Sequence, residues 1–201
     1  MRRASQQEIE QLLETLPVDE KNTKFAKGAH NLWVRFHNYG KHDPFVLELY
    51  GQIVAVCHIT VLKNKDYANL YEIYTIPNGE GKGYASTLYW QIMEHMANSY
   101  SGIRLKMSCT PSSIGWHYKN GILGYGVDPS GSIRVDMPIE PTKELQLALR
   151  EGWKTNPEYV LPPAKILEKL LKENPTFGVK KSAQVKQSID TMGEYYLRES
   201  L

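Results

Sequence analysis

Short hydrophobic runs, several of them alternating with polar residues, dominate the first half of the chain and predict β-strands. Four such runs occupy residues 31–37, 45–50, 53–62 and 70–76. The connections between them are of hairpin length, and the one at Gly51 and Gln52 fits a tight turn. We therefore expect three or four consecutive strands with antiparallel pairing.

Hydrophobic residues at helical spacing predict helices before and after these strands. The predicted helices cover residues 6–16, 86–98, 112–123, 142–153, 163–173 and 182–198, and further strands are predicted at residues 103–109, 124–127 and 132–137. After Pro138 the pattern is entirely helical. We expect a domain at residues 1–138 and a C-terminal helical extension at residues 139–201, packed on that domain or on a partner.

Composition and charge narrow the class of protein. The chain has 201 residues, 41% of them hydrophobic, which is enough for a folded core, and a net charge of +2, which does not indicate nucleic-acid binding. No apolar run reaches the roughly 18 residues that span a bilayer, so we expect a soluble, cytoplasmic protein without a membrane partner. Two isolated cysteines, Cys57 and Cys109, and histidines without ligand spacing predict no metal site.

A glycine-rich turn at residues 78–85 carries the clearest functional signal, because it joins a predicted strand directly to a predicted helix. Such a turn places backbone N–H groups and the positive end of a helix at one point, which suits a phosphate. Gly83 and Ala85 lack bulk where a ligand would approach, and the amides of Gly81 to Ser86 are expected to be free donors. A glycine-rich connection that binds nothing is the alternative.

The order of these elements resembles the GNAT superfamily of N-acetyltransferases over roughly residues 6–137. In that family a Val-x-Pro at the strand end precedes Arg/Gln-x-x-Gly-x-Gly/Ala. Here Pro77, Gly83 and Ala85 match this pattern, whereas Glu80 stands where the family has Arg or Gln. The resemblance implies an α/β (α+β) fold with a mixed, mostly antiparallel sheet flanked by helices, and the C-terminal helical extension lies outside it.

The same resemblance implies transfer of an acetyl group from acetyl-CoA, as co-substrate, to an amine acceptor by direct attack. The residues implied in binding acetyl-CoA are Tyr74, Thr75, Ile76, Gly81, Lys82, Gly83, Tyr84, Ala85 and Ser86. Lys82 could offset the charge of Glu80, or it could be an ordinary surface lysine.

Enzymes of this family often use a glutamate on the strand before the turn as general base and a tyrosine on a later helix as general acid. Glu72 is the only carboxylate within residues 70–76, and Tyr118 lies in a segment that resembles the family's Phe-Tyr-x-x-x-Gly-Phe. The alternatives are an exposed or lysine-paired strand residue for Glu72 and a packed aromatic for Tyr118. We expect His117, beside it, to be a surface histidine.

Two other hypotheses stay open. The chain could be an inactive GNAT-fold binding or assembly module that pairs subunits into a homo-oligomer through residues 141–201. It could also transfer an acyl group other than acetyl, from a longer acyl-CoA or another carrier.

Overall fold

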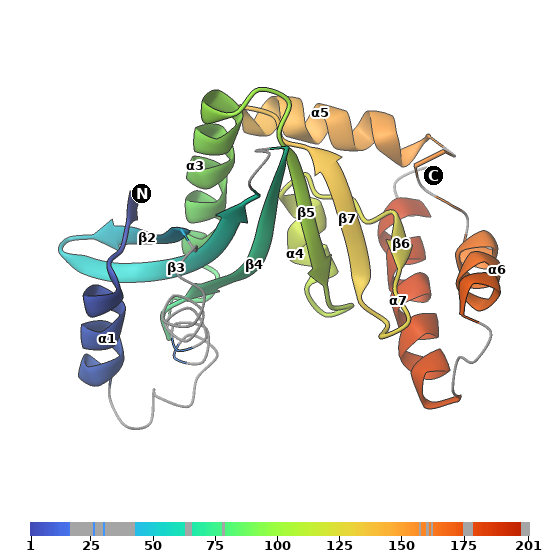
Figure 1. Ribbon diagram of the computed structural model, residues 1–201, viewed down its shortest axis with the longest axis horizontal. Coiled ribbons are helices and arrows are strands. Elements are labelled where there is room, and N and C mark those ends of the chain that lie inside the picture. The colour runs from blue at the N-terminus through green and yellow to red at the C-terminus, as the bar shows by residue number, and fades with distance from the viewer. Residues whose placement is uncertain are drawn as a thin grey trace. The chain divides into compact units, whose positions relative to one another are not determined.

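The computed structural model of the protein, shown in Figure 1, describes most of the chain. The described residues are 1–16, 26, 30, 43–62, 66–77, 79–156, 158–159, 161, 163–174 and 179–197. They form two compact units, residues 1–103 and 104–201, which contain seven strands and six helices within the described ranges. The strand predicted at residues 31–37 lies outside the described residues.

Four antiparallel strands form the sheet of the first unit. They are β1 (Arg2–Arg3), β2 (Asp43–Leu49), β3 (Gln52–Val61) and β4 (Tyr67–Thr75), paired in that order. The predicted antiparallel pairing of the last three is confirmed, with the tight turn at Tyr50 and Gly51, one residue earlier than predicted. Both turn residues have positive φ, 52° and 77°, as a two-residue hairpin turn requires. β1 was not predicted, because two residues are too few to show an alternating pattern.

Two helices cover opposite faces of this sheet, α1 (Gln6–Thr15) and α3 (Tyr84–Ser99). Val46 and Val56 are directly paired across β2 and β3 and pack with Ile9 of α1. Phe45, the residue of β2 just before Val46, points to the other face, where its ring centroid lies 6.0 Å from that of His95 in α3. Alternation along the strands thus supplies one hydrophobic face to each helix.

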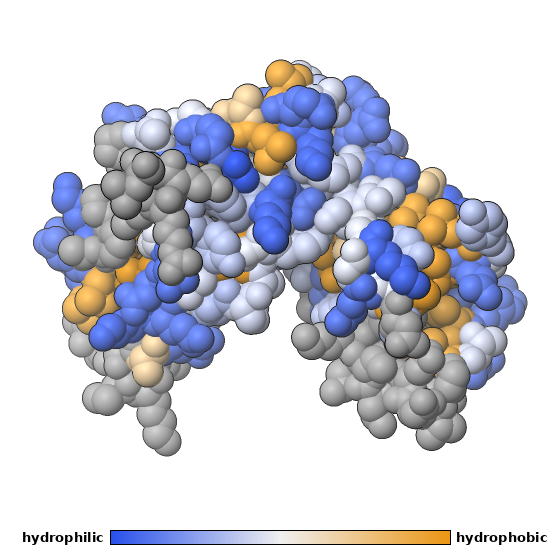
Figure 2. Space-filling model, turned by 180° about the vertical axis from the view of Figure 1, so that it is seen from behind, coloured by the Kyte–Doolittle hydropathy of each residue, from blue (hydrophilic) through white to orange (hydrophobic). Residues whose placement is uncertain are grey.

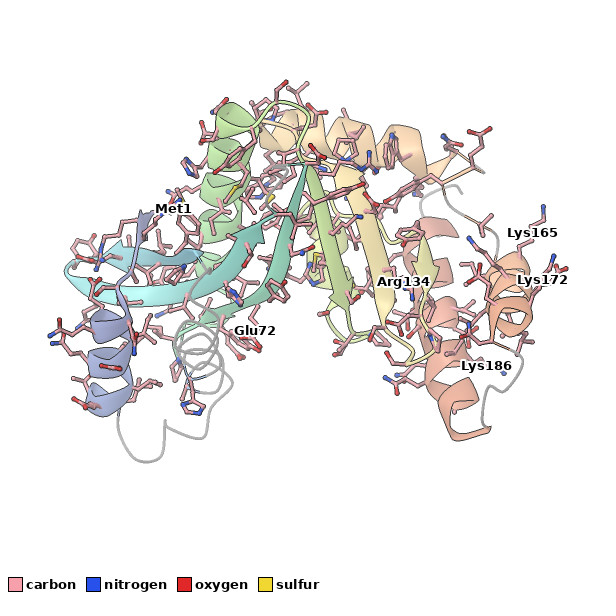
Figure 3. The ribbon with its side chains drawn as sticks, viewed as in Figure 1. Met1, Glu72, Arg134, Lys165, Lys172 and Lys186 are labelled. Atoms are coloured by element: carbon pink, nitrogen blue, oxygen red, sulfur yellow. The ribbon has the colours of Figure 1, made fainter. Side chains whose placement is uncertain are left out.

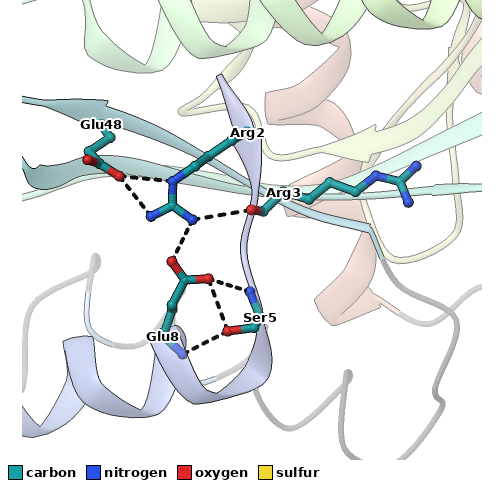
Figure 4. Close-up of polar contacts among 5 residues, drawn as sticks. All are labelled: Arg2, Arg3, Ser5, Glu8 and Glu48. Atoms are coloured by element: carbon teal, nitrogen blue, oxygen red, sulfur yellow. Dashed lines mark hydrogen bonds and ion pairs between the residues drawn. The ribbon is translucent and has the colours of Figure 1, made fainter.

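The start of α1 is attached to the sheet by a cluster of charged groups, drawn in Figure 4. Arg2 donates hydrogen bonds to Glu48 of β2 at 2.7 and 2.9 Å and forms an ion pair with Glu8 at 2.5 Å. Glu8 and Ser5 form a capping box, in which the Ser5 N–H donates to the Glu8 carboxylate at 2.8 Å. Hydrogen bonds from Ser5 and Arg2 to the carboxylate lower the pKa of Glu8.

The second unit contains β5 (Arg104–Cys109), β6 (Gly126–Val127) and β7 (Ile133–Pro138), antiparallel in the order β5-β7-β6. Its helices are α4 (Ile114–Lys119), α5 (Lys143–Lys154), α6 (Pro163–Glu173) and α7 (Val179–Leu197). The bounds of α6 are those predicted, whereas α4 is shorter than expected and ends before Gly121, whose φ is +76°.

The C-terminal helices share one hydrophobic core with the strands of the second unit. This core joins residues of β5, α4, the segment before β6, β6, β7, α6 and α7, namely Cys109, Ile114, Tyr118, Leu123, Val127, Ile133, Ile166, Leu170, Val185, Ile189 and Met192. At the turn before β7, Ser188 of α7 donates a hydrogen bond to the Gly131 carbonyl. The extension was predicted to pack on the preceding domain or on a partner. In the structure, α6 and α7 pack on strands and helix α4 of the second unit. Pairing of subunits through these helices stays a prediction.

The surface seen in Figure 2 is mostly hydrophilic, with separate hydrophobic patches. On α6, Leu167 and Leu171 are 41% and 48% exposed, one helical turn apart. Among the described helices, none has the length and hydrophobicity needed to cross a membrane.

Candidate active site

The turn between β4 and α3 is held by a chain of backbone hydrogen bonds. Ile76 extends the β4 ladder by donating to the Val54 carbonyl at 3.0 Å, and the Gly79 N–H donates back to Ile76 at 3.0 Å. The Lys82 N–H then donates to Gly79 at 3.2 Å. Gly79 is required for steric reasons, because a Cβ there would lie 3.0 Å from the Ile76 carbonyl oxygen and side chain. These contacts connect the described residues on either side of residue 78.

Gly83 is the N-cap of α3 and has a left-handed backbone, with φ of +81° and no side chain to cap the helix. A Cβ at Gly83 would meet no atom within 4 Å, so the backbone angle, and not the space, explains this glycine. The first turn of α3 contains no acidic residue. The N–H groups of Tyr84, Ala85 and Ser86 make no hydrogen bond to any described residue, whereas Thr87 donates to Gly83 at 2.9 Å.

Among the described residues, three of the predicted donors therefore have no partner at the positive end of a helix. The Lys82 amide, also expected to be free, is instead used inside the turn, because the turn folds back on Gly79. The side chains of both Glu80 and Lys82 are exposed. Water screens the charge of Glu80 at such a position, which limits its effect on an anion at the helix end.

At the end of β4, two of the three residues expected to bind acetyl-CoA have partly buried side chains. Tyr74 and Ile76 pack their side chains against the hydrophobic cluster beneath α1. The N–H and the carbonyl of Ile76 are both used within the fold, by Val54 and Gly79, so the binding role expected for Tyr74, Thr75 and Ile76 stays a prediction.

Glu72 lies on β4 about 10 Å along the strand from Thr75, and Figure 3 labels it there. A register shift in the pairing of β3 with β4 lies next to it, so that Tyr71 and Glu72 together oppose His58. The His58 and Tyr71 rings stack with their centroids 4.6 Å apart, and His58 is fully buried. The bulge thus groups a carboxylate, a phenol and an imidazole on neighbouring strands, a grouping that sequence spacing does not reveal.

Tyr118 lies on α4 of the second unit and is 4% exposed. Its ring is in the hydrophobic core described above, between residues of α5 and α7. Arg150 and Tyr195, which contact this ring, were missed by the sequence reasoning because they follow Tyr118 by 32 and 77 positions.

The expectation for His117 was wrong, because the residue is 6% exposed. Its Nδ1 is buried without a hydrogen-bond partner among the described residues. Burial disfavours the charged imidazolium and lowers the pKa of His117 from 6.5 to about 4. Within the described residues, no group of three or more potential ligands could hold a metal ion.

An antiparallel sheet, a glycine turn and a helix N-terminus whose first amides have no partner among the described residues define an α/β protein. The sequence matches the model of the acetyltransferase (GNAT) family over residues 8–122, which is more than half of the chain. The chain therefore belongs to the GNAT family of acetyltransferases, and its fold is the one expected. Among curated protein sequences, no significant match was found.

Solved structures support the fold. GCN5 of Tetrahymena is 20% identical with a TM-score of 0.50, and the match covers 66% of this chain and 89% of that one. A protein of the GNAT family from Desulfovibrio desulfuricans is 13% identical with a TM-score of 0.54, covering 71% and 98%. The GNAT acetyltransferase of Streptococcus pneumoniae is 15% identical with a TM-score of 0.50, covering 69% and 98%. At these identities the likeness concerns the fold.

Proposed function

We propose that this protein is an acetyl-CoA-dependent N-acetyltransferase that moves the acetyl group to the nitrogen of an amine acceptor. The observation that carries the proposal is the N-terminus of α3, where the amides of Tyr84, Ala85 and Ser86 follow the left-handed Gly83 and have no partner in the described part of the chain. Such an end binds anions, and the diphosphate of CoA is the anion that this family binds. Membership in the family supports the proposal.

In the proposed reaction the neutral amine nitrogen attacks the thioester carbonyl carbon, the carbon–sulfur bond breaks, and CoA leaves as a thiolate. Glu72 takes the first proton of the acceptor ammonium, directly or through a water, and the nitrogen gives its second proton to water once the carbon–nitrogen bond has formed. Tyr71, which is 43% exposed beside Glu72, is better placed to orient such a water than Tyr74, whose side chain packs in the core. Tyr118 gives its proton to the thiolate.

Calorimetry with acetyl-CoA and CoA tests the binding step. Ala85→Glu adds bulk and negative charge among the three free amides, yet an acid suits the start of a helix, so folding should be kept. We expect at least about tenfold weaker binding for this variant. Thr87→Glu adds the same charge at the exposed residue whose amide is already paired, and it should change affinity by less than about threefold. Absence of binding to the wild type at about millimolar ligand would refute the proposal.

Thiol release across a panel of amines tests turnover. Both cysteines of the protein are buried, and burial raises the pKa of Cys109 to about 12 and that of Cys57 further, so neither should contribute to the signal. Glu72→Gln should lower kcat by a factor of roughly 10² or more, and the exposed Glu94→Gln is its control. A rate that Glu72→Gln leaves unchanged removes Glu72 from the mechanism.

A further inference from the structure

The ring of Tyr118 is enclosed by side chains from the C-terminal helices α5 and α7. The guanidinium of Arg150 in α5 lies over the ring, with its carbon 4.1 Å from the ring centroid. One helical turn later, the Lys154 ammonium lies 5.9 Å from the same centroid. From α7, the Tyr195 ring approaches to 5.7 Å. Two cations and an aromatic ring of the extension therefore surround one phenol of α4.

Arg150 also holds the backbone of α4. Its Nη1 donates a hydrogen bond to the Tyr118 carbonyl oxygen at 2.6 Å, one of the carbonyls at the end of this short helix. The guanidinium is itself oriented by Glu151, which accepts from its Nε at 2.7 Å. The Arg150 side chain is 12% exposed, so its charge is poorly screened by water.

The contact between α4 and α7 leaves no room for another side chain. A Cβ at Gly115 would lie 2.9 Å from Cζ of Tyr195 and closer still to its hydroxyl. Tyr195 therefore reaches the Tyr118 ring only because residue 115 is glycine. The position of the phenol is determined from two sides by residues outside the family match at 8–122.

We propose that Arg150, with Lys154, is a positioning residue for proton donation by Tyr118, an inference that rests on the proposed function. When CoA leaves as a thiolate, the proton on the Tyr118 oxygen passes to the sulfur and a tyrosinate remains until water reprotonates it. A cation 4.1 Å from the ring stabilises this anion, and the hydrogen bond to the Tyr118 carbonyl keeps α4 in place. The C-terminal extension is then part of the catalytic unit.

A double-mutant cycle on the full chain tests this inference. Arg150→Met should lower kcat about tenfold or more with the KM for acetyl-CoA changed by less than about threefold, and Arg150→Lys, which keeps the charge, should recover most of the loss. In the Tyr118→Phe background, Arg150→Met should have almost no further effect, because the proton it assists is gone. Arg134→Met, at an exposed arginine of β7, is the matched control.

Each result separates the inference from the proposed function. If Tyr118→Phe lowers kcat and Arg150→Met does not, the inference is overturned and the proposed function stands. An equal loss from Arg150→Met with and without the Tyr118 hydroxyl shows a purely structural role and also overturns it. If Arg150→Met does not fold by circular dichroism, Lys154→Met is measured in the same cycle, and a loss of kcat that is equal with and without the Tyr118 hydroxyl overturns the inference. Unchanged kcat in Tyr118→Phe overturns both the inference and the acid role of Tyr118, while acetyl-CoA binding still reports on the function.

Discussion

Lowering the pH should destabilise the protein through His117, and replacing His117 by leucine should remove that part of the pH dependence. His117 is 6% exposed and its Nδ1 lacks a partner among the described residues, so the folded chain holds the ring neutral. Its pKa is lowered to about 4 in the folded state, against an ordinary value of 6.5 that applies when the chain is unfolded. Between these two values the unfolded chain binds the proton and the folded chain does not.

Because the unfolded state binds more protons in this window, stability is full above pH 6.5 and is lost as the pH falls toward 4. The slope is about 1.4 kcal/mol per pH unit well inside the window. Going from about pH 7.5 to about pH 5, His117 should cost the wild type about 2 kcal/mol of unfolding free energy.

Urea unfolding of the wild type and of His117→Leu at both pH values measures this term. All other groups titrate in both proteins. The difference between the unfolding free energies of the two proteins therefore changes with pH only through His117. The value at about pH 7.5, where the ring is neutral in both states, gives the cost or gain of the substitution itself. A stability difference that is the same at both pH values refutes the reasoning, and His117→Gln repeats the test with a polar side chain.

Three further predictions concern stability and are read by urea unfolding. Gly83→Ala should cost about 1 kcal/mol from its positive φ alone, whereas Gly126→Ala, equally open but without positive φ, should cost less. Gly115→Ala should lower the unfolding free energy by about 1–3 kcal/mol, because the added methyl group meets Tyr195. Combining it with Tyr195→Phe should recover part of this loss, and effects of the two substitutions that simply add would contradict the steric explanation. Arg2→Ala should cost less than about 1 kcal/mol, because its ion pairs are largely exposed, and added salt should shrink the difference.

The β4, turn and α3 segment could be predicted because its signals are local. Glycine at residue 83 is needed for a left-handed N-cap, and the hydrophobic stripe of α3 recurs at helical spacing, so neither depends on distant residues. The bounds were less accurate, since β4 begins at Tyr67 and not at residue 70. Strand ends depend on the partner strand, here β3, which pairs as far as Ala68.

The candidate site was predicted less completely. Tyr118 and Glu72 were selected by their place in a pattern, but the pattern says nothing about their neighbours. The stacking of His58 on Tyr71 follows from a register shift in the pairing of β3 with β4, which no residue type announces. His117 was expected at the surface because neighbouring residues of a helix point in different directions, and only packing shows that it is buried.

By itself the sequence determined the family, the order of the helices and of strands β2 to β7, and the glycine turn, since each depends on residues a few positions apart. Only the tertiary structure decided that Arg150 lies over the ring of Tyr118 and that Tyr195 reaches it past Gly115. These contacts join segments far apart in the chain, and packing between such segments leaves no periodic trace in either one. The physical reason is that hydrophobic periodicity records which face of an element is buried, but not what covers it.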